Sequence, residues 1–131
     1  MGLDPVIPDT NFFILGLKGN KECGPLLLKW VENDQLLISA IVVAEFLTKA
    51  DPKEEEIFQS YLDKFPVPPI TEKTAKIAAK IRKESLGRKT TPHLGDCLIA
   101  AQCLENHASL ATFNTADFPR LINLIDLPPK I

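Results

Sequence analysis

Long apolar runs are missing from this sequence of 131 residues. Stretches such as Ala40 to Ala44 fall far short of the roughly 20 consecutive apolar residues that a membrane-spanning helix needs. The first residues, MGLDPVIPD, have no basic segment followed by an apolar stretch, so they predict no secretory signal. We therefore expect no membrane segment and take the cytoplasm as the expected location.

Cysteine is scarce as well, with Cys23, Cys97 and Cys103 as its only representatives. Three cysteines at these separations form neither an even disulfide set nor a closely spaced pair of the kind that binds zinc. Cys97 and Cys103 lie in an apolar stretch with helical spacing, where cysteine usually serves as a small hydrophobic residue. We expect all three to be structural.

Strong net charge, internal repeats and long linkers are absent too. The formal net charge of −2 gives no general attraction to nucleic acid, although a local basic stretch could still bind it. Hydrophobic residues at 45% and charged residues at 24% are near globular averages, which excludes disordered and fibrous proteins. We expect one domain spanning residues 1–131, large enough to bury a core without disulfides or a structural metal.

What the sequence does contain is an alternation of short apolar runs with longer stretches of helical spacing. The short runs predict strands at Val6–Pro8, Leu36–Ser39, Val67–Ile70, Ser109–Thr112 and Leu124–Asp126. The longer stretches predict helices at Pro25–Glu32, Ala40–Ala50, Pro52–Lys64, Thr71–Leu86 and Pro92–Asn106. Strands that alternate with helices imply an α/β fold, in which a central parallel sheet of short strands is covered on both faces.

Acidic residues that follow strands are the first candidates for function, because ligands of open parallel sheets bind beyond the carboxyl ends of the strands. Asp9 ends the first predicted strand, in IPDTNFF. An Asx turn or the N-cap of a following helix would also explain an aspartate at this place. Taken alone, Asp9 leaves both interpretations open.

A single carboxylate, Glu45, interrupts the apolar stretch SAIVVAEFL. It must be solvated, paired or bound to a cation, because an isolated ionised carboxylate in an apolar environment is strongly disfavoured. On a helix, Lys49 is one turn away, so an exposed Glu45–Lys49 pair worth a few tenths of a kcal/mol is the plain alternative. The apolar flanks favour a bound cation first, the ion pair second and solvation last.

Asp96 lies in PHLGDCLIAAQCL, on the same helical stripe as the core-type residues Ile99 and Cys103. A first-turn aspartate stabilised by the helix dipole is the alternative. His93 shares this turn, but a lone histidine without a second ligand is more often structural. Asp96 is therefore a candidate whose weight depends on the other acidic residues.

The segment SLATFNTADF adds a fourth group, in which a short strand delivers Thr112 and the following loop carries Asn114 and Asp117. Turn chemistry would also explain this loop. Taken together, three or four carboxylates follow different strands or face the same end of the sheet, and such a group cannot all stay ionised side by side without a cation. A hard divalent ion such as Mg²⁺ or Mn²⁺ prefers such oxygen ligands and can activate water. Metal-dependent phosphodiester cleavage is the predicted chemistry.

Four blocks, DTNFFI, ISAIVVAEFL, HLGDCLIAAQCL and LATFNTADF, resemble those of PIN-domain nucleases in order and separation, especially the VapC-type toxins of bacterial toxin–antitoxin pairs. The resemblance spans nearly the whole chain. It implies a three-layer α/β/α fold, a pocket for Mg²⁺ or Mn²⁺, and RNA as the substrate. It assigns the acidic metal-site positions to Asp9, Glu45, Asp96 and Asp117. It assigns supporting polar positions to Asn11, Thr112 and Asn114, with Asn11 orienting Asp9.

The resemblance also implies how the RNA would be cut and held. A metal-activated water would attack the phosphorus in line and leave a 5′-phosphate and a 3′-hydroxyl. Many PIN domains carry an aspartate where this chain has Asn114, so one firmly bound metal is implied and a second stays open, with Asp117 as a substitute. The cations that would position the RNA are Lys73, Lys76, Lys80, Arg82, Lys83, Arg88 and Lys89. A solvated helix face would explain the same cluster.

The implied partners are a cognate antitoxin, whose C-terminal segment would cover the pocket, and a second copy of the chain in a homodimer. The apolar helices Pro25–Glu32 and Pro52–Phe65 would supply such surfaces, although core packing explains most of their hydrophobicity. A catalytically silent PIN-like interaction module and a stand-alone RNA-processing nuclease are the alternatives. A phosphotransfer domain fits poorly, because Asn11 stands where a haloacid-dehalogenase-type site needs a second aspartate.

Overall fold

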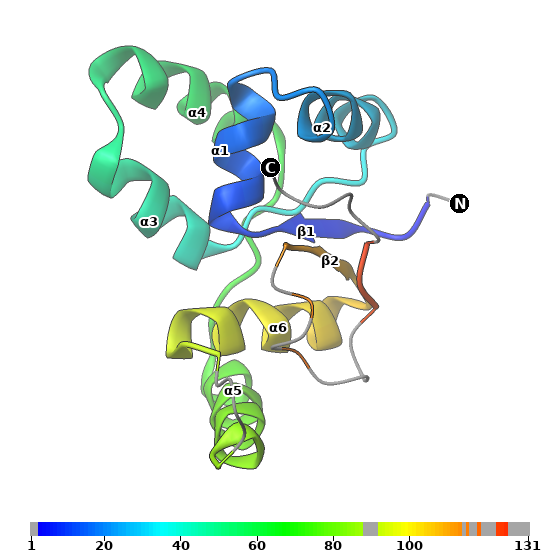
Figure 1. The fold of residues 1–131 in the computed structure, drawn as a ribbon, viewed down its shortest axis with the longest axis vertical. Coiled ribbons are helices and arrows are strands. Elements are labelled where there is room, and N and C mark those ends of the chain that lie inside the picture. Colours follow the sequence, from blue (N-terminus) through cyan, green and yellow to red (C-terminus); the bar gives the residue numbers. More distant parts are fainter. Residues whose placement is uncertain (1–2, 88–91, 114, 116–117, 119–122, 126–131) are drawn as a thin grey trace.

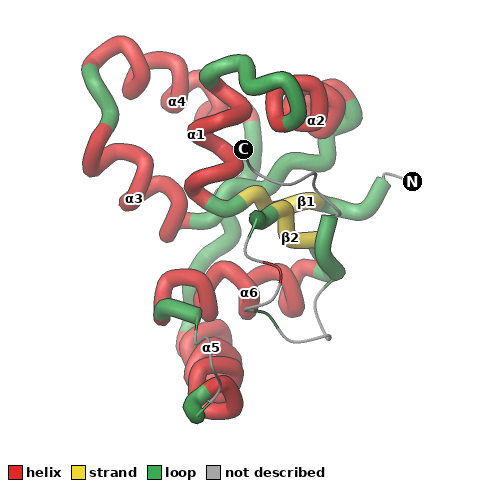
Figure 2. Tube along the Cα trace, in the orientation of Figure 1, coloured by secondary structure: helices red, strands yellow, loops and turns green. Residues whose placement is uncertain are grey.

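The computed structural model describes residues 3–87, 92–113, 115, 118 and 123–125. The elements in chain order are β1 (Val6–Pro8), α1 (Thr10–Leu17), α2 (Cys23–Glu32), α3 (Ala40–Lys49), α4 (Pro52–Lys64), α5 (Glu72–Ser85), α6 (Leu94–Asn106) and β2 (Ser109–Ala111). Figure 1 shows the two strands between a group formed by α1 to α4 and a second group formed by α5 and α6. Helices account for most of the trace in Figure 2. None of the helices in the described ranges is long and apolar enough to cross a membrane.

The centre of the fold is a small parallel sheet. β1 and β2 pair in register over all three residues of each strand. Single parallel bridges join Val6 to Leu36 on one side and Leu110 to Leu124 on the other. All four segments run in the same direction, so their carboxyl ends lie at one edge of the sheet. The predicted α/β class with a short-stranded parallel sheet is confirmed.

Three of the predicted strands are wrong in existence or by more than one residue in extent, and the strand predicted at Ser109–Thr112 ends one residue earlier, at Ala111. The strands predicted at Leu36–Ser39 and Leu124–Asp126 each contribute one bridge, and Asp126 lies outside the described residues. The segment Val67–Ile70 forms no strand; beside it, Pro66 accepts one hydrogen bond from the Ile38 N–H at 3.0 Å. Prolines stand at positions 66, 68 and 69 and carry no N–H, so this segment lacks the donors that a ladder requires.

One helix, α1, was not among the predicted helices. Its sequence TNFFILGL is apolar at nearly every position, so it has no polar face that would reveal a helical period. The helix is covered on two sides: the Phe12 ring lies 5.1 Å from the Trp30 ring of α2, and the Phe13 ring lies 5.4 Å from the Phe58 ring of α4. An all-round apolar pattern is what a helix in this position needs.

The five predicted helices are confirmed, with ends that differ by a few residues. α2 begins at Cys23 instead of Pro25, and α6 begins at Leu94 instead of Pro92. His93 occupies the N-cap position of α6, and Thr91 lies outside the described residues. Boundary differences of this size are expected, because the first and last turns of a helix have few internal hydrogen bonds.

All three cysteines are buried and free, as predicted. Burial raises the pKa of the Cys103 thiol to about 12, so this group stays protonated at neutral pH and acts as a hydrophobic residue. Cys103 and Cys97 both lie on α6, where the helix packs against the rest of the core.

Aromatic packing fixes α3 against α1 and α4. The Phe46 and Phe58 rings stack with their centroids 4.2 Å apart, and Phe13 meets Phe58 edge to face. Phe46 is 6% exposed, whereas its neighbour Glu45 is exposed. Successive residues of a helix point about 100° apart, so burying Phe46 turns Glu45 away from the core.

A buried glutamine links α6 to the start of α3. The Ser39 hydroxyl donates to Gln102 Oε1 at 2.6 Å, and Gln102 Nε2 donates to the Pro68 carbonyl at 3.0 Å. The Ser39 oxygen also accepts the Ile41 N–H at 3.1 Å, which caps α3. Gln102 is fully buried, so these bonds replace those that water would otherwise provide.

We predict that Gln102→Leu lowers the free energy of unfolding by about 2–4 kcal/mol, because the Ser39 hydroxyl and the Pro68 carbonyl lose their partner. Urea unfolding measures the loss. Gln59→Leu, at an exposed position of α4, is the matched control and should change stability by less than about 0.5 kcal/mol. Equal effects of the two substitutions would contradict the importance of this link.

Candidate functional site

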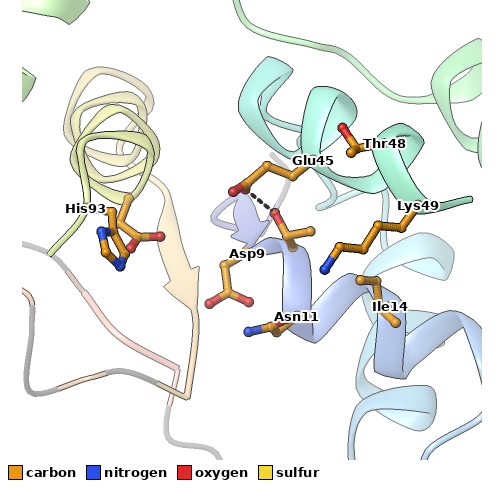
Figure 3. A pocket seen from close by; sticks show the side chains of 9 residues that line it. Asp9, Asn11, Ile14, Glu45, Thr48, Lys49 and His93 are labelled. Atoms are coloured by element: carbon orange, nitrogen blue, oxygen red, sulfur yellow. Dashed lines mark hydrogen bonds between the residues drawn. The ribbon is translucent and has the colours of Figure 1, made fainter.

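A pocket of about 430 Å³ lies where α1, α3 and the start of α6 meet. It is lined by Asp9, Thr10, Asn11, Ile14, Glu45, Thr48, Lys49, His93 and Asp96. Three of the four predicted acidic residues therefore face one space, and Asn11 faces it with them (Figure 3). The three acidic residues are far apart in the sequence, so the fold alone brings them together.

Asp9 follows β1 directly and is 8% exposed. Its backbone N–H continues the ladder by donating to the Ala111 carbonyl at 2.9 Å. Its Oδ1 accepts the Phe12 N–H at 2.9 Å and so caps α1. Figure 3 shows the Asp9 side chain between His93 and α1. Asp9 is therefore both the N-cap of α1 and a residue of the pocket, so the two interpretations drawn from the sequence do not exclude each other.

Glu45 is exposed, and the Thr10 hydroxyl donates to its Oε1 at 2.5 Å. Within the described part of the chain, no ion pair joins Glu45 to Lys49. Exposure to solvent, the state expected last for Glu45, is therefore observed, and the ion pair expected second is not, whereas binding of a cation, expected first, stays a prediction. The apolar neighbours Val42 and Phe46 point to the core, and α3 presents Glu45 to the pocket and the solvent.

Asp96 is half-buried in the first turn of α6, and its pKa lies above the ordinary carboxyl value of 3.8. Burial is the largest cause, and the negative charges of Asp9 and Glu45 raise the pKa further. A hydrogen bond from the His93 backbone N–H and the charge of His93 act in the opposite direction. The pKa of Asp96 thus reflects its burial first and its nearness to two other carboxyl groups second.

The chemistry of these groups fits a hard divalent cation. Carboxylate oxygens are the ligands that Mg²⁺ and Mn²⁺ prefer, and a cation would relieve the repulsion that raises the pKa of Asp96. Among the described residues, no three His, Cys, Asp or Glu side chains lie close enough together to hold one ion. The fit therefore rests on the type of ligand, which is carboxylate, and on the repulsion of Asp96 by Asp9 and Glu45.

The last predicted group falls largely outside the described residues. Thr112 follows β2 directly, is fully buried and is not among the residues that line the pocket. Asn114 and Asp117 lie outside the described part of the chain, as do Arg88 and Lys89 of the basic cluster. The four lysines Lys73, Lys76, Lys80 and Lys83 are exposed on α5. Lys76 pairs with Glu72 at 3.7 Å, as on an ordinary solvated helix face.

The pocket also contains residues that the sequence did not single out for it. Thr10 directly follows Asp9 and supplies the hydroxyl that holds Glu45, but a threonine after a strand carries no specific signal. From the sequence, Lys49 is expected only as an ion-pair partner and His93 only as a structural residue. Both line the pocket. Lys49 lies one helical turn from Glu45, and His93 lies one turn from Asp96, so this spacing is the sequence signal that indicates their place.

Comparisons with known proteins agree with this fold. The PIN domain profile matches residues 6–123. A comparison with curated proteins gives no match. A chain of a toxin–antitoxin complex from Klebsiella pneumoniae is 25% identical with a TM-score of 0.77, and the likeness covers 92% of this chain and 96% of that one.

Two further solved structures show the same fold at lower identity. DNA-bound VapBC from Salmonella typhimurium gives a TM-score of 0.78 at 20% identity, over 95% of this chain and 98% of that one. VapBC2 from Rickettsia felis, bound to a DNA fragment from its promoter, gives 0.77 at 20% identity, over 94% and 98% of the respective chains. These matches confirm the predicted resemblance.

We predict that Asp96→Asn stabilises the metal-free protein at neutral pH. The folded state holds the Asp96 proton more tightly than the unfolded chain, because its folded pKa is raised above 3.8. The stability due to that proton is complete below this value and is lost as the pH rises through the raised pKa. Asparagine has no such proton, so the advantage of the variant should grow from about pH 4 to pH 7.

Urea unfolding in EDTA at several pH values measures this difference. Asp34→Asn, an exposed aspartate outside the pocket, is the matched control. A gain from Asp96→Asn that is the same at both ends of the pH range would contradict the raised pKa of Asp96 in the folded protein.

Proposed function

Because the chain belongs to the PIN domain family, we propose that it is a metal-dependent endoribonuclease and the toxin of a type II toxin–antitoxin pair. The observation that carries the proposal is that Asp9, Glu45 and Asp96 line one pocket at the carboxyl edge of the sheet. The reaction is the hydrolysis of RNA phosphodiester bonds.

Asp9 and Asp96, with Glu45, are the residues that would hold Mg²⁺ or Mn²⁺, and Asp117 is the candidate for a further acidic position. A bound divalent ion would supply an activated water and stabilise negative charge at the phosphate. Thr10 holds the Glu45 carboxylate by its hydroxyl, and the Phe12 N–H holds that of Asp9. Each of these two acids is thus fixed by one donor of α1.

The supporting polar residues complete the proposed site. Asn11 lines the pocket next to Asp9 and orients that carboxylate or the substrate. Thr112 and Asn114 follow β2 and are the candidates for supporting the site from the other strand. The assignment of Asn11 follows the resemblance of the DTNFFI block to the family, and those of Thr112 and Asn114 follow that of the TFNTADF block.

The proposed partner is an antitoxin that covers the pocket. Support comes from the solved relatives, which include a toxin–antitoxin complex at 25% identity. Exposed apolar side chains on α2 and α4, namely Leu28 and Ile57, are available for contact with such a protein or with a second copy of the chain.

Purified protein with Mn²⁺ or Mg²⁺ is expected to cleave RNA, and EDTA should abolish cleavage. Asp9→Asn and Asp96→Asn should each lower the rate by roughly 100-fold or more, because metal-ion catalysis is worth several kcal/mol. Asparagine is also a good N-cap, so Asp9→Asn removes the charge and keeps the cap of α1. Asp34→Asn should retain full activity. Gel electrophoresis of labelled RNA measures the rates.

Isothermal titration with Mn²⁺ separates this proposal from a catalytically silent interaction module. The proposed nuclease binds Mn²⁺, and the binding weakens in Asp9→Asn and Asp96→Asn. Cleavage that survives both EDTA and these substitutions would show that the activity comes from elsewhere. Absence of both cleavage and acid-dependent Mn²⁺ binding would favour the silent module.

The toxin role predicts growth arrest. Induced expression of the chain in a bacterial host should stop growth within a few generations, whereas the Asp96→Asn variant at equal abundance should not. Co-expression of a short reading frame encoded beside the gene should restore growth. Normal growth with a fully active nuclease would instead indicate a stand-alone RNA-processing enzyme.

A further inference from the structure

Lys49 is a cationic side chain in a pocket that also contains three carboxyl groups and the imidazole of His93. It is the last residue of α3 and is exposed. It lines the pocket together with Asp9, Glu45 and Asp96. Figure 3 shows its amino group reaching from α3 toward α1. The pocket therefore has an acidic part and a basic edge.

The obvious structural role for Lys49 is an ion pair with Glu45, four residues earlier on the same helix. The described residues contain no such pair within 4.0 Å, and Glu45 is held by the Thr10 hydroxyl instead. Lys49 also forms no ion pair with any other described residue. Its ammonium group is thus available to a ligand without the loss of an existing ion pair.

An RNA strand that enters this pocket carries one negative charge at each phosphate, and the carboxylates repel those phosphates that no metal neutralises. A cation at the pocket edge offsets this repulsion. Lysine suits the task, because its ammonium is a point charge on a flexible stem and can follow a phosphate without a fixed hydrogen-bonding geometry.

We infer that Lys49 binds a phosphate of the RNA backbone next to the one that is cleaved. This contact positions the strand in the pocket. This inference rests on the proposed ribonuclease function and adds a substrate-binding residue to it. The contact is made to the backbone, so it contributes affinity without base preference.

The test is the binding of a fluorescein-labelled 12-nucleotide oligouridylate to the full chain in EDTA, measured by fluorescence anisotropy at several KCl concentrations. Lys49→Gln should weaken binding about fivefold at roughly 0.1 M salt and make the slope of log K against log salt shallower by about 0.7, the value for one phosphate contact on a single strand. Lys49→Arg should retain wild-type binding.

Lys29→Gln is the matched control. Lys29 is also an exposed lysine in the last turn of its helix, α2, and it does not line the pocket. The same charge change at Lys29 should leave both the affinity and the salt slope close to wild type. In the cleavage assay with Mn²⁺, Lys49→Gln should raise KM severalfold and change kcat less than twofold.

Equal affinity and equal slope for wild type, Lys49→Gln and Lys29→Gln would overturn the inference, including the case in which none of them binds. The inference would also be overturned if Lys49→Gln changed the affinity for Mn²⁺ and left the affinity for the oligonucleotide unchanged. Lys49 would then act as a counter-ion of Glu45. The binding assay contains no metal, so its result is independent of cleavage.

The two proposals can therefore fail separately. Cleavage of RNA without an effect of Lys49→Gln on oligonucleotide binding would refute only this inference. Such an effect on binding without any cleavage would refute only the nuclease function.

Discussion

The parallel pairing of β1 with β2 determines where the candidate functional residues lie. Because both strands run the same way, Asp9 and Thr112 leave the sheet at the same edge. α6 precedes β2 and joins it through a turn at His107, whose φ of 51° is left-handed. The N-terminus of α6, with Asp96, therefore returns to that same edge. Three pairs of residues in a ladder thus align groups from distant parts of the chain.

The pocket concentrates negative charge, and the structure holds each carboxylate by a separate donor. Asp9 accepts from the Phe12 N–H, Glu45 accepts from the Thr10 hydroxyl, and Asp96 accepts from the His93 N–H. Two of these donors are backbone groups at the start of a helix, where N–H groups have no intrahelical partner. Helix starts therefore stabilise the acids one by one, although the acids repel one another. Clusters of this kind are typical of sites whose function depends on charge.

Much of this arrangement could be predicted from the sequence. Alternating strand and helix patterns indicated the fold class. Asp9 was a candidate because it follows a strand, Glu45 and Asp96 because they interrupt apolar helical stretches, and the resemblance to PIN domains joined the three in one site. The helix α1 escaped prediction because TNFFILGL is covered on two sides and shows no polar face. The hydrogen bond from Thr10 to Glu45 joins residues 35 positions apart, and no local pattern encodes a contact of that kind.

The same limit explains Lys49. Helical spacing correctly placed it one turn from Glu45, and the usual preference for such pairs made an ion pair the plain alternative to a bound cation. In the structure, the hydroxyl of Thr10, which lies on α1, donates to the Glu45 carboxylate instead. Periodicity determines which residues share a face, whereas tertiary contacts determine which partner a polar group selects.

The prolines at positions 66, 68 and 69 have a further consequence for the behaviour of the protein in solution. An exposed strand offers unpaired N–H and C=O groups to other chains and is a common starting point for aggregation. The segment that lies beside Ile38 accepts one hydrogen bond through Pro66, but three of its five residues have no N–H to give. A foreign strand would find few donors there. Proline thus makes this side of the sheet a poor template for intermolecular β-pairing.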